Sequence, residues 1–186
     1  MNNINTAVKV TGIVEARFYD QSTLSQYQQW VNKAILKIRN AVPKIMKFYQ
    51  LGELKNADIH QNVICNAGFN AVAKLLTGDV TYTGEINKMA LGTGTTGSAS
   101  ATDTELETET YRNDTASGTD DENIAYVTAY FTEGEVNGTF TEFGNFIDGT
   151  GTADTGQLWT HLKGLNWVKD GLTVLVISCK YTFASV

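Results

Sequence analysis

The feature of this chain that most restricts its fold is a series of short segments, mostly in its second half, that are rich in β-branched and aromatic residues. Such side chains pack well on the pleated surface of a half-buried sheet. Turn signals rich in Gly, Asn and Asp separate these segments at residues 118–121, 136–138 and 148–151. We predict strands at residues 8–18, 124–132, 138–146, 158–162 and 172–183, with Asn137-Gly138 as a hairpin turn.

Several strands at short spacing predict a mainly β fold, an antiparallel β-sandwich or jelly-roll-like domain. The chain has 186 residues, enough for one hydrophobic core, and its 10% aromatic content argues against disorder. We therefore expect residues 1–186 to form a single β-sandwich domain, with a helical insertion at residues 21–60. One short helix is also expected at residues 66–78, where the apolar residues are Phe69, Val72, Ala73, Leu75 and Leu76.

The insertion carries the clearest periodicity in the chain. Its apolar residues follow an alternating spacing of three and four, which places them in one stripe on a helix. They are Leu24, Tyr27, Val31, Ala34, Ile38, Ala41, Ile45 and Phe48. Ser22 and Thr23 are candidate N-caps, and Gly52 is a candidate stop. Pro43 lacks a backbone N–H and clashes with the preceding turn, so we expect two helices, or one sharply kinked helix, that break near residues 40–43.

Charge is unevenly distributed between this segment and the rest of the chain. Residues 21–52, which we call the arm, contain no acidic residue and five basic ones: Lys33, Lys37, Arg39, Lys44 and Lys47. Because the whole chain carries −6 and the arm +5, the remainder carries −11. Ten of the twenty carboxylates lie between Asp103 and Glu135, where Arg112 is the single cation. The chain thus joins a basic segment to an acidic body.

The sequence leaves three roles open for the arm. It can cover one face of its own domain, dock onto a second copy or another protein, or bind DNA or an anionic membrane through its cations. Few aromatic residues alternate with the cations and no second basic patch exists, so a nucleic-acid partner is not expected. For the docking role, the candidate interface residues are Leu24, Tyr27, Val31, Ala34, Ile38, Ile45 and Phe48.

A Gly/Thr tract at residues 92–97 has the letters GTGTTG, which match the GxGxxG pattern of dinucleotide-binding loops. Such a loop must open a helix, whereas residues 98–102 are rich in Ser and Thr. A Walker loop would need a Lys directly after its last Gly, and no Lys follows before Lys163. We interpret the tract as a connection between strands in which glycine permits positive φ.

No set of residues converges on a catalytic or metal site, so we expect no enzyme, no catalytic residue, no cofactor and no metal. Glu105, Glu107 and Glu109 alternate and would share one face of a strand, which favours a solvated acidic face. Asp148 and Asp154 lie among glycines but lack the spacing of an EF-hand loop. Both cysteines are expected to be buried as small hydrophobes, while a disulfide between them stays open. The histidines and cysteines are scattered, at His60, His161, Cys65 and Cys179.

Several segments carry a resemblance when taken in their order along the chain. They are residues 12–20 (GIVEARFYD), 62–78 (NVICNAGFNAVAKLLTG), 89–96 (MALGTGTT), 103–106 (DTEL), 109–112 (ETYR), 141–146 (TEFGNF) and 173–183 (TVLVISCKYTF). In this order they resemble a family of tailed-bacteriophage virion structural proteins, the tail, fibre and head-associated proteins. The main departure is at residues 21–60, where the family has a short turn.

The resemblance implies a non-enzymatic structural component of a tailed-phage virion that assembles with itself and with capsid, neck or tail proteins. The alternative is a receptor- or carbohydrate-binding module of a phage fibre. The implied localisation is the virion, after synthesis in the host bacterial cytoplasm. Residues 1–6 lack the basic start and apolar core of a signal peptide, and no run of about 18 apolar residues predicts a membrane span.

We predict that residues 92–100 bind no nucleotide. Without a following Lys or helix, the tract has backbone amides but neither the cation nor the helix dipole that holds a phosphate. Calorimetric titration with ATP, GTP and NADH at moderate ionic strength is expected to give no saturable heat. Saturable micromolar binding that Gly94→Val abolishes would contradict this prediction, and the non-enzymatic interpretation with it.

Overall fold

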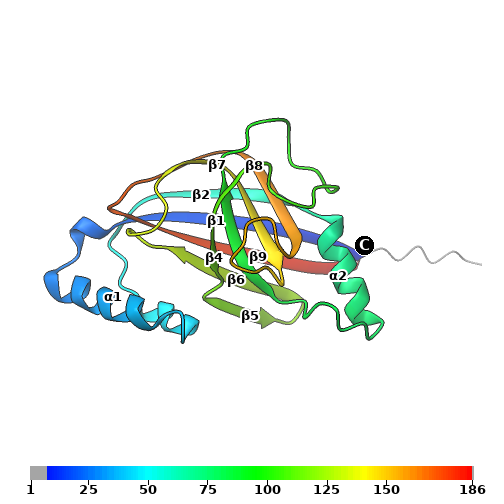
Figure 1. The fold of residues 1–186 in the computed structure, drawn as a ribbon, viewed down its shortest axis with the longest axis horizontal. Coiled ribbons are helices and arrows are strands. Elements are labelled where there is room, and N and C mark those ends of the chain that lie inside the picture. The colour runs from blue at the N-terminus through cyan, green and yellow to red at the C-terminus, as the bar shows by residue number, and fades with distance from the viewer. Residues whose placement is uncertain (1–7, 186) are drawn as a thin grey trace, which may run out of the picture.

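The computed structural model describes residues 8–185 of the chain, and strands make up most of it (Figure 1). Two α-helices, α1 (Gln26–Ile38) and α2 (Asn66–Leu76), and two short 3-10 helices, η1 (Gln21–Thr23) and η2 (Pro43–Phe48), accompany the strands. The strands are β1 (Val8–Asp20), β2 (Glu53–Ile64), β3 (Ile86–Gly92), β4 (Glu109–Asp114), β5 (Ser117–Asp121), β6 (Ile124–Phe131), β7 (Gly138–Ile147), β8 (Gln157–Lys169) and β9 (Thr173–Ser185).

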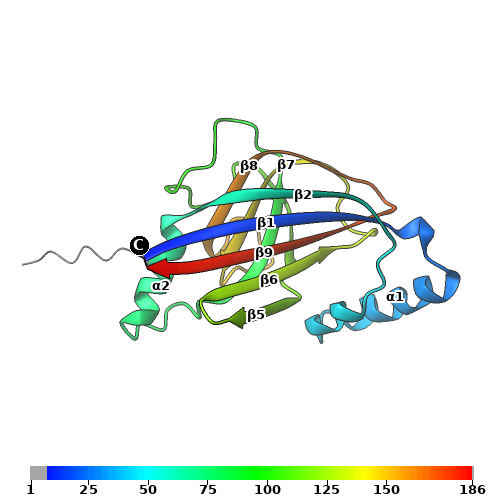
Figure 2. The ribbon, with the colours of Figure 1, turned by 180° about the vertical axis from the view of Figure 1, so that it is seen from behind.

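The strands form one curled antiparallel sheet in the order β4-β3-β7-β8-β2-β1-β9-β6-β5. β1 pairs along its full length with β9, and over residues 12–20 with β2. β2 meets β8 only through Val63 and Ile64. The sheet therefore turns a corner at that point and folds into two layers (Figures 1 and 2). One layer contains β2, β1, β9, β6 and β5, and the other contains β8, β7, β3 and β4.

The segment of residues 109–121 links the two open edges of this sheet. Its first half is β4, which pairs with β3, and its second half is β5, which pairs with β6. Between the two halves, the Ala116 N–H donates to the Thr128 carbonyl at 2.8 Å. The Asn113 side chain donates to the Tyr130 carbonyl at 2.7 Å. The two layers are thus joined on both sides of the core.

The core between the layers is built largely from aromatic side chains. Each large aromatic residue buries on the order of 150–250 Å², which contributes about 25 cal/mol per Å² before opposing terms. α2 covers one end of this core, where a Cβ on Gly68 would lie 2.4 Å from Cε3 of Trp159. Only glycine permits the helix to come so close. The largest completely buried core residues are Trp167, Tyr181, Phe131, Phe140 and Phe143.

The predicted fold class is confirmed: the domain is mainly β, antiparallel and sandwich-like, with a helical arm between β1 and β2 and one short helix, α2. Two turn predictions are wrong. Residues 118–121 lie in β5, and the turn follows at Glu122, whose φ is +52°. Asn137-Gly138 closes no hairpin, because β6 and β7 lie in different layers and pair with β9 and β8 instead.

Both cysteines are buried, and within the described part of the chain neither forms a disulfide. Burial raises the pKa of the Cys65 thiol to about 12 and that of the Cys179 thiol to about 11. The interpretation of both residues as small buried hydrophobes is therefore confirmed.

In residues 8–185, no helix combines the length and the apolar character that crossing a membrane as a helix requires. The prediction that residues 1–6 carry no signal peptide concerns a segment outside the described residues.

Candidate functional site

The arm follows its predicted outline, but its predicted N-cap is wrong. α1 begins after Ser25, which forms a capping box with Gln28. The Gln28 N–H donates to Ser25 Oγ at 3.3 Å, and the Ser25 N–H donates to Gln28 Oε1 at 3.0 Å. Ser22 and Thr23 lie in η1 instead. The expected break near residues 40–43 is confirmed, since α1 ends at Ile38 and Pro43 opens η2.

The predicted end of the helical insertion at residue 60 is also wrong. Helical structure stops at Phe48, and β2 starts at Glu53, which lies opposite Asp20 of β1. Residues 53–60 are therefore part of the sheet. Their backbone groups pair with β1, and this long-range pairing outweighs the local sequence.

A buried asparagine ties the arm to the chain that leads into β2. Asn32 of α1 is only 2% exposed. Its Nδ2 donates to the Gln50 carbonyl at 2.9 Å and to Gln21 Oε1 at 3.1 Å, while its Oδ1 accepts the Gln50 N–H at 2.7 Å. One side chain thus joins the beginning, the middle and the end of the arm. Leaving such buried groups unpaired costs about 1–3 kcal/mol each.

An ion pair provides the second anchor, between the arm and the loop after β6. Arg39, at the end of α1, pairs with Glu135. Glu135 also accepts the Thr132 N–H at 2.6 Å and the Tyr111 hydroxyl at 3.0 Å. Burial acts to raise the pKa of Glu135, but Arg39 and the hydrogen bonds hold that pKa below its usual value. The carboxylate therefore stays charged and keeps Arg39 in place.

The inner face of the arm packs on the outside of the sheet. Ile35, Met46 and Tyr49 are buried there with Val174 and Val176 of β9. Three of the predicted interface residues also face the body. Leu24 is buried, and Val31 and Ile45 are half-buried. For these three residues the structure places the contact within the domain, as in the first of the three roles considered for the arm.

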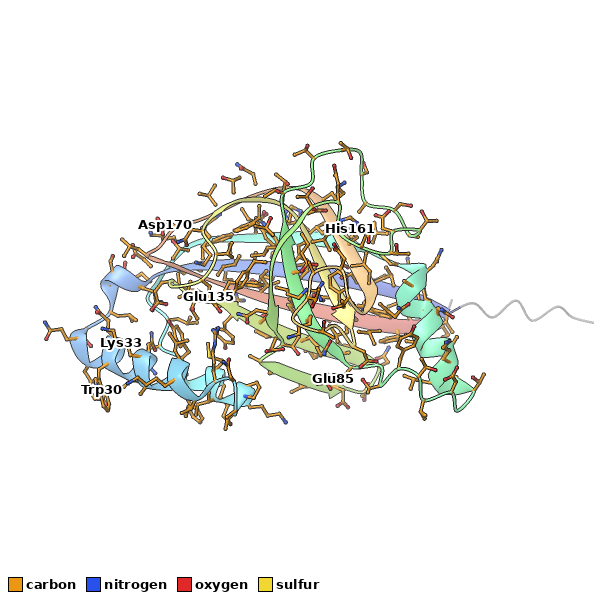
Figure 3. The ribbon with its side chains drawn as sticks, viewed as in Figure 1. Trp30, Lys33, Glu85, Glu135, His161 and Asp170 are labelled. Carbon is orange, nitrogen blue, oxygen red and sulfur yellow. The ribbon has the colours of Figure 1, made fainter. Side chains whose placement is uncertain are left out.

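The outer face of the arm remains open. Figure 3 shows Trp30 on the side of α1 that faces away from the sheet. Its ring stacks on Tyr27, with the ring centroids 6.2 Å apart. Ala34, another predicted interface residue, is exposed as well. We call the large exposed apolar residues of the arm the outer arm face; they are Tyr27 (71% exposed), Trp30 (65%), Ile38 (48%), Val42 (49%) and Phe48 (55%).

A second buried carboxylate organises the Gly/Thr tract. Glu142 of β7 is completely buried. Its Oε1 accepts the N–H of Gly94 at 2.9 Å and of Thr108 at 2.7 Å, and its Oε2 accepts the N–H of Glu107 at 3.0 Å. The Thr96 N–H donates to the Glu107 side chain at 2.9 Å. The tract therefore does bind anions with its backbone, but the anions are carboxylates of the same chain.

The close approach of Glu142 explains two of the glycines. A Cβ on Gly92 would lie 2.4 Å from Glu142 Oε1, and a Cβ on Gly94 would lie 2.7 Å from the same atom and 2.5 Å from Glu107 Cβ. The sequence pattern predicts that these glycines are needed for positive φ. Within the tract, only Gly97 has a positive φ, of +64°. The interpretation as a connection between strands is confirmed, because β3 ends at Gly92 and the next strand, β4, begins at Glu109.

His161 of β8 completes this buried cluster (Figure 3). Its Nε2 lies 3.1 Å from Glu142 Oε2, and its Nδ1 lies 2.7 Å from Asp103 Oδ2. Burial acts to raise the pKa of Glu142, but His161 and the three backbone N–H groups lower it to about 2. Because both ring nitrogens face carboxylates, neither is free to take a proton from a substrate. The cluster holds the loop of residues 93–108 against β7 and β8.

The acidic residues after the tract do not share one strand face, so that expectation is wrong. Glu105 is exposed in the loop, and Glu107 accepts Lys163 Nζ at 2.5 Å. Glu109 alone lies in a strand, where it pairs with Arg112 at 2.5 Å.

The two aspartates considered as calcium ligands, Asp148 and Asp154, both lie in turns of the backbone. Asp148 accepts the Thr83 N–H at 2.7 Å, and Asp154 adopts a left-handed backbone with φ of +58°. Within residues 8–185, no group of three or more His, Cys, Asp or Glu side chains is arranged to hold a metal ion.

No protein-family model, no curated protein and no solved structure matches this chain. The function is therefore inferred from the geometry of the arm and of the buried clusters, together with the order of segments described above.

We predict that Glu142 makes the stability of the fold depend on pH. Its pKa is lowered from 4.5 to about 2, so its stabilisation is fully present above pH 4.5 and is lost as the pH falls through about 2. This shift corresponds to about 3 kcal/mol at neutral pH. Glu142→Gln is expected to lower the free energy of unfolding by about this amount at neutral pH and to flatten its decline in acid, as measured by urea unfolding.

The matched control is Glu105→Gln, which changes an exposed carboxylate of the same loop. It is expected to leave the pH profile unchanged. A Glu142→Gln variant as stable as the parent at neutral pH would show that this cluster does not hold the loop.

Proposed function

We propose that the protein is a non-enzymatic structural component of a tailed-phage virion, and that it assembles by docking the outer arm face onto a second copy of the chain. The observation that carries the proposal is the exposure of five large apolar side chains on the arm, within residues 27–48. Large apolar residues gathered on one face are typical of an interaction surface. The resemblance of the chain to virion structural proteins supports the class.

The anchoring of the arm supports a docking role. Asn32 in the middle of α1 and the Arg39–Glu135 pair at its end hold the helix against the body. The outer arm face is therefore formed before any partner arrives, and docking does not need to order the helix. Less ordering means a smaller entropic cost of association.

Charge complementarity favours a second copy as the occupant. The body is acidic, and β5 is an edge strand that ends in Asp120 and Asp121, with Glu122 next to them; all three are exposed. β5 contacts η2, and its acidic end, residues 120–122, points away from the arm toward α2 (Figure 2). A two-fold arrangement then places each arm against the acidic edge of the other copy. The exposed cations of the arm are Lys33, Lys37, Lys44 and Lys47.

In this proposal, further contacts with capsid, neck or tail proteins complete the role in the virion, which is reached after synthesis in the host bacterial cytoplasm. The alternative, a receptor- or carbohydrate-binding module of a fibre, calls for exposed aromatic side chains on a loop-rich face. Tyr27 and Trp30 lie on a helix instead, beside aliphatic side chains. This arrangement favours assembly over sugar binding.

We predict that the double variant Trp30→Asp, Ile38→Asp is monomeric under conditions in which the parent chain associates. Both changes place a charge on the outer arm face, where burial without a partner is costly. Because both side chains are exposed in the single chain, the far-UV circular dichroism spectrum is expected to stay unchanged. Sedimentation equilibrium over a range of concentrations measures the assembled mass.

Val80→Asp is the matched control, since Val80 is 86% exposed and lies outside the arm. This variant is expected to associate like the parent. A parent chain that stays monomeric throughout the range, or a double variant with the parent's mass, would contradict docking through the arm.

A further inference from the structure

A chamber opens between the two layers of the sheet at the end that α2 covers. Its volume is about 110 Å³. The walls come from α2, from the loop after it, and from β3, β6, β7, β8 and β9, and their side chains are mostly apolar. The lining residues are Val72, Gly84, Ile86, Ala125, Ile147, Trp159, Tyr181 and Phe183.

Two polar groups belong to the residues of this wall, and only one of them is satisfied. The Tyr181 hydroxyl is bonded to the Asn145 side chain and lies 3.3 Å from Thr160 Oγ1. The indole Nε1–H of Trp159 is buried and has no hydrogen-bond partner within residues 8–185. Trp159 as a whole is only 2% exposed. Buried donors are nearly always paired, because an unpaired one loses its bond to water without replacement.

An outer hollow adjoins the chamber and gives it a polar entrance. It has a volume of about 260 Å³ and shares Gly84, Ile86 and Ala125 with the chamber. Its other walls include Glu85, which Figure 3 shows between α2 and β5, and Asp120. Two carboxylates at the entrance disfavour an anionic ligand.

We propose that the unpaired Trp159 Nε1–H faces this chamber, and that the chamber is a binding site for a small, neutral, mainly apolar molecule whose one carbonyl oxygen accepts that N–H. The apolar walls supply the burial, and the indole N–H selects for an acceptor at one end of the ligand. An apolar cavity of about 150 Å³ is known to hold benzene. The ligand is therefore the size of a single aromatic ring or a short branched chain, and any polar extension reaches toward the outer hollow. This inference is independent of the role proposed for the arm.

The test compares two ligands of nearly the same shape on the full chain. Benzaldehyde carries a formyl group, which includes the carbonyl oxygen. Toluene carries a methyl group in place of the formyl group and has no acceptor. Without a donor in the chamber, the aldehyde would bind more weakly, because its oxygen would lose its bonds to water. With the Trp159 donor available, we expect benzaldehyde to bind about fivefold more tightly than toluene, since one net hydrogen bond is worth about a factor of five. Ligand-observed NMR titration measures both affinities.

Two variants locate the site. Trp159→Phe removes the N–H but keeps a ring, and is expected to abolish the preference for benzaldehyde while toluene still binds. Val72→Phe keeps the N–H but fills the chamber from α2, and is expected to abolish binding of both ligands. Circular dichroism and thermal melting confirm that each variant is folded.

Several results would overturn the proposal. The first is that neither ligand binds at millimolar concentration. This is the outcome expected if the Trp159 Nε1–H pairs only with water. Another is equal binding of the two ligands, which would make the chamber a plain apolar void. Binding that folded Val72→Phe leaves unchanged would place the ligand elsewhere.

Discussion

The antiparallel pairing of β1 with its two neighbours is the interaction on which the rest of the structure depends. β1 runs beside β9 from Val8 to Asp20, and beside β2 until Asp20 faces Glu53. Because Asp20 and Glu53 lie opposite each other, the sheet itself holds both ends of the arm. A long segment between two fixed, neighbouring ends adds little entropic cost to the fold. The arm is therefore an insertion into a hairpin, and it lies on the outer surface of the adjacent strand, β9, through Val174 and Val176.

Two of the acidic residues, Glu142 and Glu135, organise loops of the chain from within the fold. Glu142 accepts hydrogen bonds from backbone N–H groups of the Gly/Thr loop. Glu135 accepts hydrogen bonds from the Thr132 N–H and the Tyr111 hydroxyl, and it forms an ion pair with Arg39. Each carboxylate is paired with several donors, as a buried charge must be. Removing one partner of such a cluster is strongly destabilising, typically by about 3–5 kcal/mol. These two carboxylates thus hold loops of the chain in place.

Local pattern was sufficient to predict the β-rich class, the positions of β1, β6, β7 and β9, α2 and the break of the arm at Pro43. It failed where a long-range partner decides the outcome. The Asn137-Gly138 pair has strong turn chemistry, yet the chain crosses there from one layer to the other. The spacing of the arm residues predicted an apolar stripe but not which side of the helix meets the body. Asn32 and Ile35, next to that stripe, make the contact together with Val31 of the stripe. Likewise, the GTGTTG letters revealed a special loop but not its partner, Glu142. The only local sign of that partner in the sequence is Glu142 itself, an acidic residue between Phe140 and Phe143 in a strand.

If the outer arm face is the contact surface between copies, Trp30 becomes covered on assembly, and the exposure of the three tryptophans makes this measurable. Trp30 is 65% exposed, whereas Trp159 and Trp167 are 2% and 1% exposed. Acrylamide quenching of tryptophan fluorescence therefore reports mainly on Trp30. The measurement is the quenching constant as a function of protein concentration, with the assembled mass followed in the same samples. The account predicts that quenching falls as the mass rises, because Trp30 becomes covered. A mass that rises while quenching stays constant would place the contact elsewhere on the molecule and contradict the account.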